Sequence, residues 1–518
     1  MMKKSYVIVF CTLSVLLLYG ASTHAQQSKT LTENSYAHAR QILERGVQAL
    51  GGLKNFQAVE DIAYKSSAQV PEIGQSANPE AAYFSRPLDT EGIIDLRGKR
   101  NYQLSKTHFL GSGLRSSSTV TTDKSGFTVD VRANAVYAFE APAIAANNRR
   151  VQRIFPHLLL QLALNRAASL RWLGEENYDG RKQQIIAFTD TDASLFTLYF
   201  DAQADLLTKV ETLTDNVLKG LCASETIFSD YRPVSGVQMP FHVVSKVGGE
   251  VTSDLTYNEI KFNTHPDAAL FEIPKGAEAG PAIGGAPQPV TLTKLAKDVY
   301  FVNAISTNGV FFYSSMFVVF KDYVLVVEAP LNDATSQSII AKIKETVPGK
   351  PIKYLVPTHY HIDHTGGARS YIAEGSTVVT TPGNRNFFEK LARVSHPLNP
   401  DRLSLQPRQP SVETFKEKRV FNDGEQVVEL YNVGPTQHAD EILIIYLPQH
   451  KLAFVSDLFL TNFNGRIGPA EPLNVFFYEK IQQLGLQIET IAAGHGRIST
   501  MKELKQSIAE KDSTSNGR

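Results

Sequence analysis

Three histidines and one aspartate lie within six residues of this chain: His359, His361, Asp363 and His364. The apolar run before them, residues 352–356, predicts a short buried strand, which places the cluster on the loop at the strand's carboxyl end. Residues two apart in an extended loop point the same way, so the first two histidines can bind one metal ion. The aspartate and the third histidine then face a neighbouring position. Because imidazole and carboxylate groups are metal donors, the cluster predicts a metal site at the edge of a sheet.

Three further candidate ligands follow apolar strands later in the chain: His438, Asp457 and His495. The strands predicted before them cover residues 427–430, 451–455 and 488–492. Each strand is followed by a side chain of a type that binds metals, as a site at one sheet edge needs. One such residue alone would be a weak signal, but together with the first cluster the set strongly predicts a metal centre.

A chain of 518 residues is too long for one ordinary hydrophobic core, so two domains are expected. Between residues 61 and 271, short alternating segments separated by turns predict a mainly antiparallel β domain, assigned to residues 26–275. Helical spacing of apolar residues predicts two helices in it, at 36–50 and at 155–168.

The second half of the chain has a different pattern. Residues 276–289 are dense in glycine, alanine and proline and predict an interdomain linker. Strands and helices alternate in residues 290–500, which predicts an α/β domain. Residues 501–518 predict a C-terminal helix followed by a loose polar tail.

The first 25 residues have the pattern of a signal peptide. Lys3 and Lys4 precede an apolar run at 6–19, and small residues lead to a predicted cleavage site after Ala25. The apolar run is short for a membrane span, although an uncleaved anchor remains the alternative. The pattern predicts bacterial export to the periplasm or beyond. After cleavage Cys222 would be the remaining cysteine, which excludes an intramolecular disulfide.

The charge balance argues against a polyanionic partner. Lys+Arg and Asp+Glu both number 52, and the formal net charge is zero. Nucleic-acid binders usually have a basic patch or stripe, so no nucleic-acid partner is expected and a small-molecule substrate is favoured. The sequence does not indicate an oligomeric state.

The ordered set of seven residues resembles the full ligand pattern of the metallo-β-lactamase-fold hydrolases. The resemblance covers about residues 290–500 and implies an αββα sandwich with two metal ions at one edge of the paired sheets. It implies a first metal held by His359, His361 and His438. It implies a second metal held by Asp363, His364 and His495. Asp457 would bridge the two ions.

This resemblance also implies a chemistry. Imidazole and carboxylate donors without a thiolate suit two zinc ions, and iron or manganese fits the same donors. Two close metals make a bridging hydroxide available near neutral pH and polarise a carbonyl or phosphoryl oxygen. By analogy with the family, Asp363 would be the catalytic residue that orients the hydroxide and later protonates the leaving group. The chain is therefore expected to be a metal-dependent hydrolase.

Two positions refine the resemblance. The true β-lactamase branches have cysteine or serine at the bridging position, so Asp457 favours the branches that hydrolyse thioesters, lactones or phosphodiesters. Many family members carry an aspartate in the turn after an early strand, where this chain has Glu328. Ester, lactone or thioester hydrolysis is the preferred function. The alternatives are a mononuclear iron oxygenase of the persulfide-dioxygenase kind, a β-lactamase, and a non-catalytic lipid-binding or sensor protein.

The N-terminal region loosely resembles the periplasmic lipoprotein-carrier (LolA-like) half-barrel domains. The resemblance rests on four segments: 49–52, 231–240, 262–263 and 268–274. It implies a concave sheet that can hold an acyl chain or lipid. A domain that only positions its neighbour is an equal alternative.

Three loops are expected to lie over the metals and to choose the substrate: 306–315, 395–415 and 461–472. They and their flanks carry apolar side chains, which predict an apolar or acyl-bearing substrate. The equal alternative is that these side chains pack under the loops or against the first domain. The side chains are Phe311, Phe312, Tyr313, Leu398, Leu403, Leu405, Phe459 and Phe463.

Overall fold

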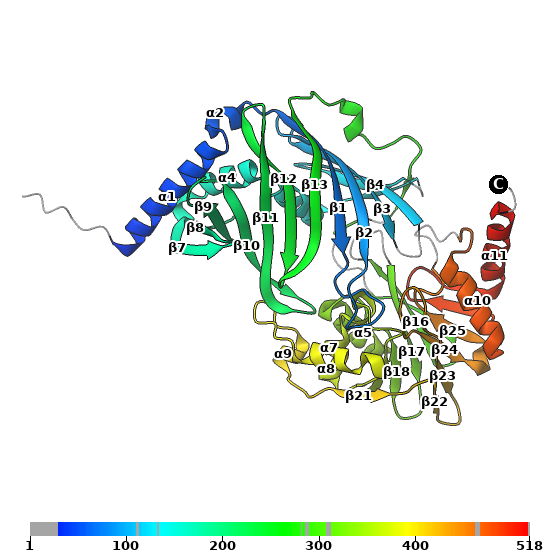
Figure 1. The fold of residues 1–518 in the computed structure, drawn as a ribbon. Coiled ribbons are helices and arrows are strands. Elements are labelled where there is room, and N and C mark those ends of the chain that lie inside the picture. Colours follow the sequence, from blue (N-terminus) through cyan, green and yellow to red (C-terminus); the bar gives the residue numbers. More distant parts are fainter. Residues whose placement is uncertain are drawn as a thin grey trace, which may run out of the picture.

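The computed structural model has a large N-terminal sheet followed by a smaller two-sheet domain (Figure 1). It describes residues 30–109, 113–131, 134–280, 282–284, 290–306, 312–460 and 467–515. The predicted signal peptide, Phe311 and Phe463 lie outside these ranges. Within the described ranges, no helix has the length and apolar character that crossing a membrane requires.

The N-terminal sheet has fourteen strands in the order β14-β6-β5-β4-β3-β2-β1-β13-β12-β11-β10-β9-β8-β7. Neighbouring strands are antiparallel except for β14 and β6, which confirms the mainly antiparallel prediction. The strands are β1 (Asp61–Pro71), β2 (Ser85–Asp95), β3 (Arg100–Phe109), β4 (Gly113–Thr122), β5 (Gly126–Asp130), β6 (Ala135–Ala138), β7 (Arg171–Tyr178), β8 (Arg181–Thr189), β9 (Leu195–Asp201), β10 (Leu207–Asn216), β11 (Gly220–Val234), β12 (Val237–Val247), β13 (Glu250–Phe262) and β14 (Glu278–Ala279).

Helices α1 (Leu31–Ala49) and α4 (Pro156–Asn165) share one apolar core with this sheet. Helix α1 begins before the predicted residue 36 because Thr30 and Glu33 form a capping box. The N-terminal domain also contains helices α2 (Gly52–Gln57) and α3 (Ala141–Gln152). Helix α3 was not predicted, since Ile144 is its one buried residue and its apolar periodicity is weak.

Part of the predicted linker is packed against the N-terminal sheet. Strand β14 lies within residues 276–289 and pairs in parallel with β6. The Gly280 N–H donates to the Val136 carbonyl, and the Ile283 N–H donates to the Ala138 carbonyl, each at 2.7 Å. Backbone pairing therefore holds a segment whose composition predicts a flexible connection.

The C-terminal domain has two sheets, of seven and six strands. The first contains β15 (Leu292–Ala296), β16 (Val299–Ser306), β17 (Phe312–Val319), β18 (Val324–Val327), β19 (Ile352–Val356), β20 (Thr377–Thr380) and β21 (Ser411–Thr414). The second contains β22 (Lys418–Asn422), β23 (Val427–Asn432), β24 (Leu443–Leu447), β25 (Leu452–Val455), β26 (Thr490–Ala493) and β27 (Ser499–Thr500). The helices are α5 (Asp333–Thr346), α6 (Ile362–Thr365), α7 (Ala368–Glu374), α8 (Arg385–Arg393), α9 (Arg402–Leu405), α10 (Pro472–Leu484) and α11 (Met501–Ser515).

Side-chain alternation along the strands gives each sheet two buried faces. Met316 and Leu325 of the first sheet share a core with Ile445 of the second sheet. On the outer faces, Phe317 and Val326 pack with helices α5, α7 and α8, whereas Ile444 and Val455 pack with α10 and α11. These layers form the predicted αββα sandwich.

Some boundaries differ from the predictions. The N-cap of α5 is Asn332, where the sequence predicts Asp333 or Thr335 as the cap of a helix that ends near residue 347. The Asn332 side chain accepts the Thr335 N–H at 3.0 Å. Helix α11 runs to Ser515, through part of the tail predicted to be loose. Strands β21 and β22 were not predicted, because they are short and most of their residues are not buried.

The turn between β10 and β11, with the adjoining residue Asp215, contacts the C-terminal domain. Asp215 accepts a hydrogen bond from the Asn399 backbone at 3.0 Å and lies 2.6 Å from Nδ1 of His396. Gly220 has a φ of +68°, and a Cβ there would lie 2.3 Å from the Ser395 carbonyl oxygen. The close approach of the two domains therefore requires glycine at this position.

Candidate metal centre

The structure brings all seven predicted ligands together at one end of the sandwich. The loop after β19 and helix α6 carry the first four: His359, His361, Asp363 and His364. His438 lies between β23 and β24, Asp457 follows β25, and His495 follows β26. All the carrying strands end at the same edge, as the sequence predicts.

Three groups of these residues place candidate ligand atoms within 4.8 Å of one another. The first group is His359, His361 and His438. The second is Asp363, His364 and His495. The third, His359, His364 and Asp457, joins the other two. The grouping matches the division into two metal positions that the sequence resemblance implies.

Asp457 lies between the two positions. Its Oδ2 is 3.6 Å from Nε2 of His359 and of His438, and 2.9 Å from Nε2 of His364. Its Oδ1 is 3.6 Å from Nε2 of His495. Among the described residues none makes a hydrogen bond with the buried Oδ2. A buried carboxylate oxygen surrounded by imidazole nitrogens is the arrangement expected where a cation completes the site.

The other ring nitrogen of three histidines is held by a neighbouring group. Nδ1 of His359 lies 3.1 Å from the Thr358 hydroxyl, and Nδ1 of His364 lies 3.4 Å from Oε2 of Glu328. Nε2 of His361 lies 2.9 Å from the Ser76 carbonyl oxygen. In metal sites such contacts fix the tautomer and leave the opposite nitrogen for the ion. The donor set and its supporting contacts therefore fit divalent-metal binding.

Residues 308–495 match the family model described as the metallo-beta-lactamase superfamily. These residues form a metallo-beta-lactamase superfamily domain. The match lies within the predicted domain at 290–500 and confirms the family that the ligand pattern resembles. The fold implies divalent-metal binding by the histidine and aspartate cluster.

Several solved structures are similar to the metallo-beta-lactamase domain. A metallo-beta-lactamase from Pontibacter korlensis is 22% identical, with a TM-score of 0.32, and the match covers 43% of this chain and 99% of that chain. FIM-1 from Pseudomonas aeruginosa, in its mono-zinc form, is 17% identical, with a TM-score of 0.32 and coverages of 44% and 97%. The DIM-1 metallo-beta-lactamase is 16% identical, with a TM-score of 0.33 and coverages of 44% and 100%. No curated protein matches the chain.

Glu328 supports the metallo-beta-lactamase site from the turn after β18. It is fully buried, and its Oε1 accepts the Thr358 N–H at 3.2 Å while Oε2 faces His364. Its φ is +71°, which is strained for a residue with a side chain. The strained backbone aims the carboxylate at His364. Glu328 therefore contacts both the segment before His359 and the His364 ring.

Burial and neighbouring charges keep two of the histidines neutral and Asp363 ionised, which are the forms that bind metals. Burial, and then the neighbouring His361 ring, lowers the pKa of His359 well below its ordinary value. Burial also lowers the pKa of His361 to about 3. Both rings are thus neutral near pH 7, the form that binds metals. For Asp363, burial opposes ionisation, but His364 and His495 still hold the carboxyl pKa below its ordinary value.

His364 differs from the other two histidines of the first cluster. Burial opposes its protonation, but the carboxylates of Asp363 and Glu328 raise its pKa well above the ordinary value. Burial likewise opposes ionisation of Asp457, and the surrounding imidazoles nevertheless lower its pKa. A metal bound here would therefore replace a proton on His364.

The residues predicted to form a substrate pocket divide between core and surface. Phe459 and Leu403 are buried in apolar clusters, as the packing alternative expects for these two. Leu398 and Leu405 are exposed. The Tyr313 ring lies 4.9 Å from the His495 ring, which places it beside the metal centre. Tyr313 is therefore the predicted loop residue that the structure brings to the site.

Proposed function

We propose that this chain is an exported binuclear metal-dependent hydrolase of a small-molecule ester, lactone, thioester or similar bond. The observation that carries the proposal is the pair of three-residue donor groups with Asp457 between them. Zinc suits these donors, with iron or manganese as alternatives. Export rests on the signal-peptide pattern of residues 1–25.

Two bound divalent ions would lower the pKa of a water molecule and polarise the oxygen of the scissile group. Asp363 and Asp457 would have separate roles in the reaction. Asp363 lies with Oδ2 3.4 Å from Nε2 of His364 and 3.3 Å from Nε2 of His495. Since its pKa is lowered, its carboxylate is ionised and can accept a proton from the attacking water, then deliver it to the leaving group. Asp457 lies between the two donor groups, so its carboxylate could contact an ion at either position.

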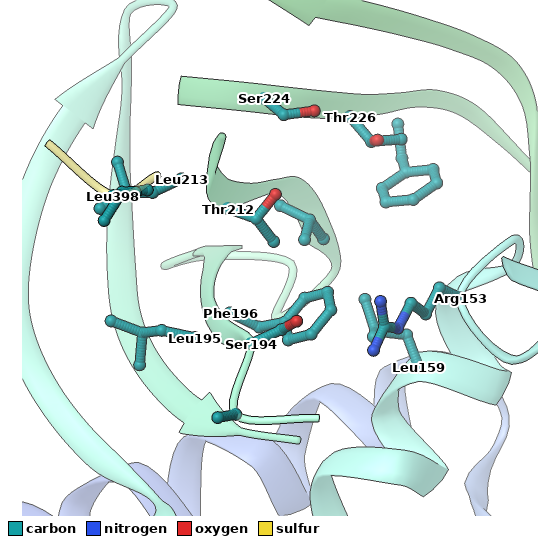
Figure 2. A pocket seen from close by; sticks show the side chains of 13 residues that line it. Arg153, Leu159, Ser194, Leu195, Phe196, Thr212, Leu213, Ser224, Thr226 and Leu398 are labelled. Carbon is teal, nitrogen blue, oxygen red and sulfur yellow. The ribbon is translucent and has the colours of Figure 1, made fainter. Parts of the chain in front are cut away.

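A cavity in the N-terminal domain is the candidate site for the proposed acyl or lipid ligand. It has a volume of about 440 Å³, within the range of small-molecule pockets. Figure 2 shows its mixed lining, with Arg153 beside Leu159 on one side and Leu195, Leu213 and Leu398 on the opposite side. Serine and threonine hydroxyls and Phe196 also line it. Leu398 of the metallo-beta-lactamase domain also lines it, so both domains would contact a ligand there.

A substrate panel tests the proposed function. Full-length protein loaded with zinc should hydrolyse at least one of a short-chain ester, a long-chain acyl ester, a lactone, a thioester and a phosphodiester. A chelator should abolish the activity, and added zinc should restore it. Rates that rise with acyl length and are inhibited by free fatty acid would support an acyl substrate.

The same panel separates the alternatives. Failure of every substrate with metal-loaded protein would contradict the hydrolase proposal. Hydrolysis of a β-lactam alone would indicate a β-lactamase. Oxygen consumption with a persulfide substrate by protein containing one iron ion would indicate the oxygenase.

A further inference from the structure

The loop between β1 and β2, residues 72–84, reaches from the N-terminal sheet to the metal centre (Figure 1). The Gly74 carbonyl accepts the Ile362 N–H at 3.3 Å, and the Ala77 carbonyl accepts the Asp440 N–H at 2.7 Å. The Asn78 side-chain amide also donates to Asp440 at 2.7 Å. The loop thus contacts two separate ligand-bearing loops of the other domain.

Ser76 supplies a carbonyl oxygen to a predicted metal ligand. This residue is 1% exposed, and its carbonyl oxygen lies 2.9 Å from Nε2 of His361. The same oxygen accepts the Tyr360 hydroxyl at 2.8 Å. Because a carbonyl can only accept, Nε2 of His361 must carry the proton, which leaves Nδ1 as the metal-binding atom.

Gln75 contacts the aspartate of the same cluster. Its side-chain Nε2 lies 3.4 Å from Oδ1 of Asp363. The other oxygen of that carboxylate, Oδ2, faces His364 and His495. The two ends of the carboxylate are therefore occupied from different domains, and Gln75 fixes its rotation.

The conformation of the loop is set by its own contacts. The Phe84 N–H donates to the Gln75 carbonyl at 2.9 Å, and the Glu72 N–H donates to the Phe84 carbonyl at 2.8 Å. Gly74 has a φ of +81°, and a Cβ there would lie 3.0 Å from Cβ of Ile362. Such a close fit leaves little freedom for the loop to shift relative to the ligands.

We propose that the N-terminal domain completes the metal centre through this loop. Gln75 is a positioning residue for Asp363, and the Ser76 carbonyl is a positioning group for His361. The inference rests on the proposed function of the centre and deepens it, since it gives the N-terminal domain a part in metal binding and turnover. The metallo-beta-lactamase domain by itself lacks both contacts.

The test compares Gln75→Met with Gln203→Met in the full-length chain. Methionine keeps the approximate volume of glutamine and removes the donor, and Gln203 is an exposed residue in the turn between β9 and β10. Zinc affinity is measured by chelator competition, site geometry by the visible spectrum of the cobalt-substituted protein, and turnover as kcat and KM.

Gln75→Met should change the cobalt spectrum and lower metal affinity or kcat by about 10-fold or more, as loss of an outer ligand contact does. KM should change less than kcat, and Gln203→Met should match the wild type. Gln75→Glu, which places a second carboxylate beside Asp363, should lower kcat further than Gln75→Met. If circular dichroism shows that Gln75→Met does not fold, Gln75→Glu is compared with Gln203→Met instead.

Nitrogen-15 spectra of the histidine side chains in the zinc-loaded wild type test the Ser76 contact. His361 should be protonated at Nε2, and protonation at Nδ1 would overturn this part of the proposal. A wild-type cobalt spectrum, affinity and kcat in both Gln75 variants would overturn the Gln75 part while leaving the proposed hydrolase intact. A wild type that neither binds metal nor hydrolyses any substrate would instead overturn the proposed function.

Discussion

Replacing Asp363 with alanine should lower kcat by roughly 100- to 10,000-fold, the range that positioned acid–base groups supply. The reason is the loss of an ionised carboxylate that lies within 3.4 Å of His364 and of His495. The measurement is steady-state hydrolysis of the best substrate in the panel, with metal content determined on the same sample. Asp363→Asn, which retains the shape but not the charge, should show a similar loss of kcat.

Asp322→Ala is the matched control for this variant. Asp322 is exposed in the turn between β17 and β18, at the opposite end of β18 from Glu328. This control should retain wild-type kcat. If Asp363→Ala kept both its metal content and full turnover, Asp363 would not have the proposed catalytic role.

Replacing Glu328 with alanine should weaken metal affinity by about 10- to 100-fold, because the buried carboxylate that orients His364 is lost. Glu328→Gln should lose less, because glutamine keeps the volume of the side chain and its one amide oxygen can still accept the Thr358 N–H. Its NH2 group then faces Nδ1 of His364 in place of a carboxylate oxygen. Both substitutions keep a side chain at a φ of +71°, so they carry similar backbone strain. Chelator competition measures the affinities.

The comparison between these two variants identifies the cause. An alanine variant that bound metal as tightly as the wild type would show that Glu328 does not support His364. Equal, large losses in both variants would mean that the carboxylate oxygen facing His364, which both variants lack, matters more than the contact with the Thr358 N–H.

The gathering of the seven candidate ligands could be predicted because each lies in a segment that follows an apolar strand. His438, Asp457 and His495 are far apart in the chain, but strands that end at one sheet edge must bring them together. The layers of the sandwich were predictable for the same reason, since alternating strands and amphipathic helices dictate which faces are buried. The position of each candidate ligand after a predicted strand was therefore enough to predict that the seven residues lie together.

The supporting contacts could not be predicted in the same way. Gln75 and Ser76 lie in a polar loop without a motif, nearly three hundred residues before the ligands that they contact. Their role depends on how the two domains dock, which local sequence patterns do not encode. Glu328 was visible as a departure from the family pattern, but its contact with His364 depends on a left-handed backbone that glutamate rarely adopts.

Within the described part of the chain, the loop of residues 72–84 and the turn around Asp215 both contact the metallo-beta-lactamase domain. The first lies at the metal centre, whereas the second lies beside Leu398, which lines the cavity of mixed polarity. The resemblance to LolA-like carriers stays a prediction. Binding of an acyl ligand in this cavity would test it.

Metal content per chain of the purified full-length protein tests the central claim most directly. Elemental analysis after saturation with zinc and removal of excess ion should give two zinc ions per chain. The Asp457→Ala variant should lose at least one of them, because Asp457 lies between both donor groups. A wild-type protein that retained no zinc, or an Asp457→Ala variant that retained the full wild-type content, would contradict the binuclear centre proposed for this chain.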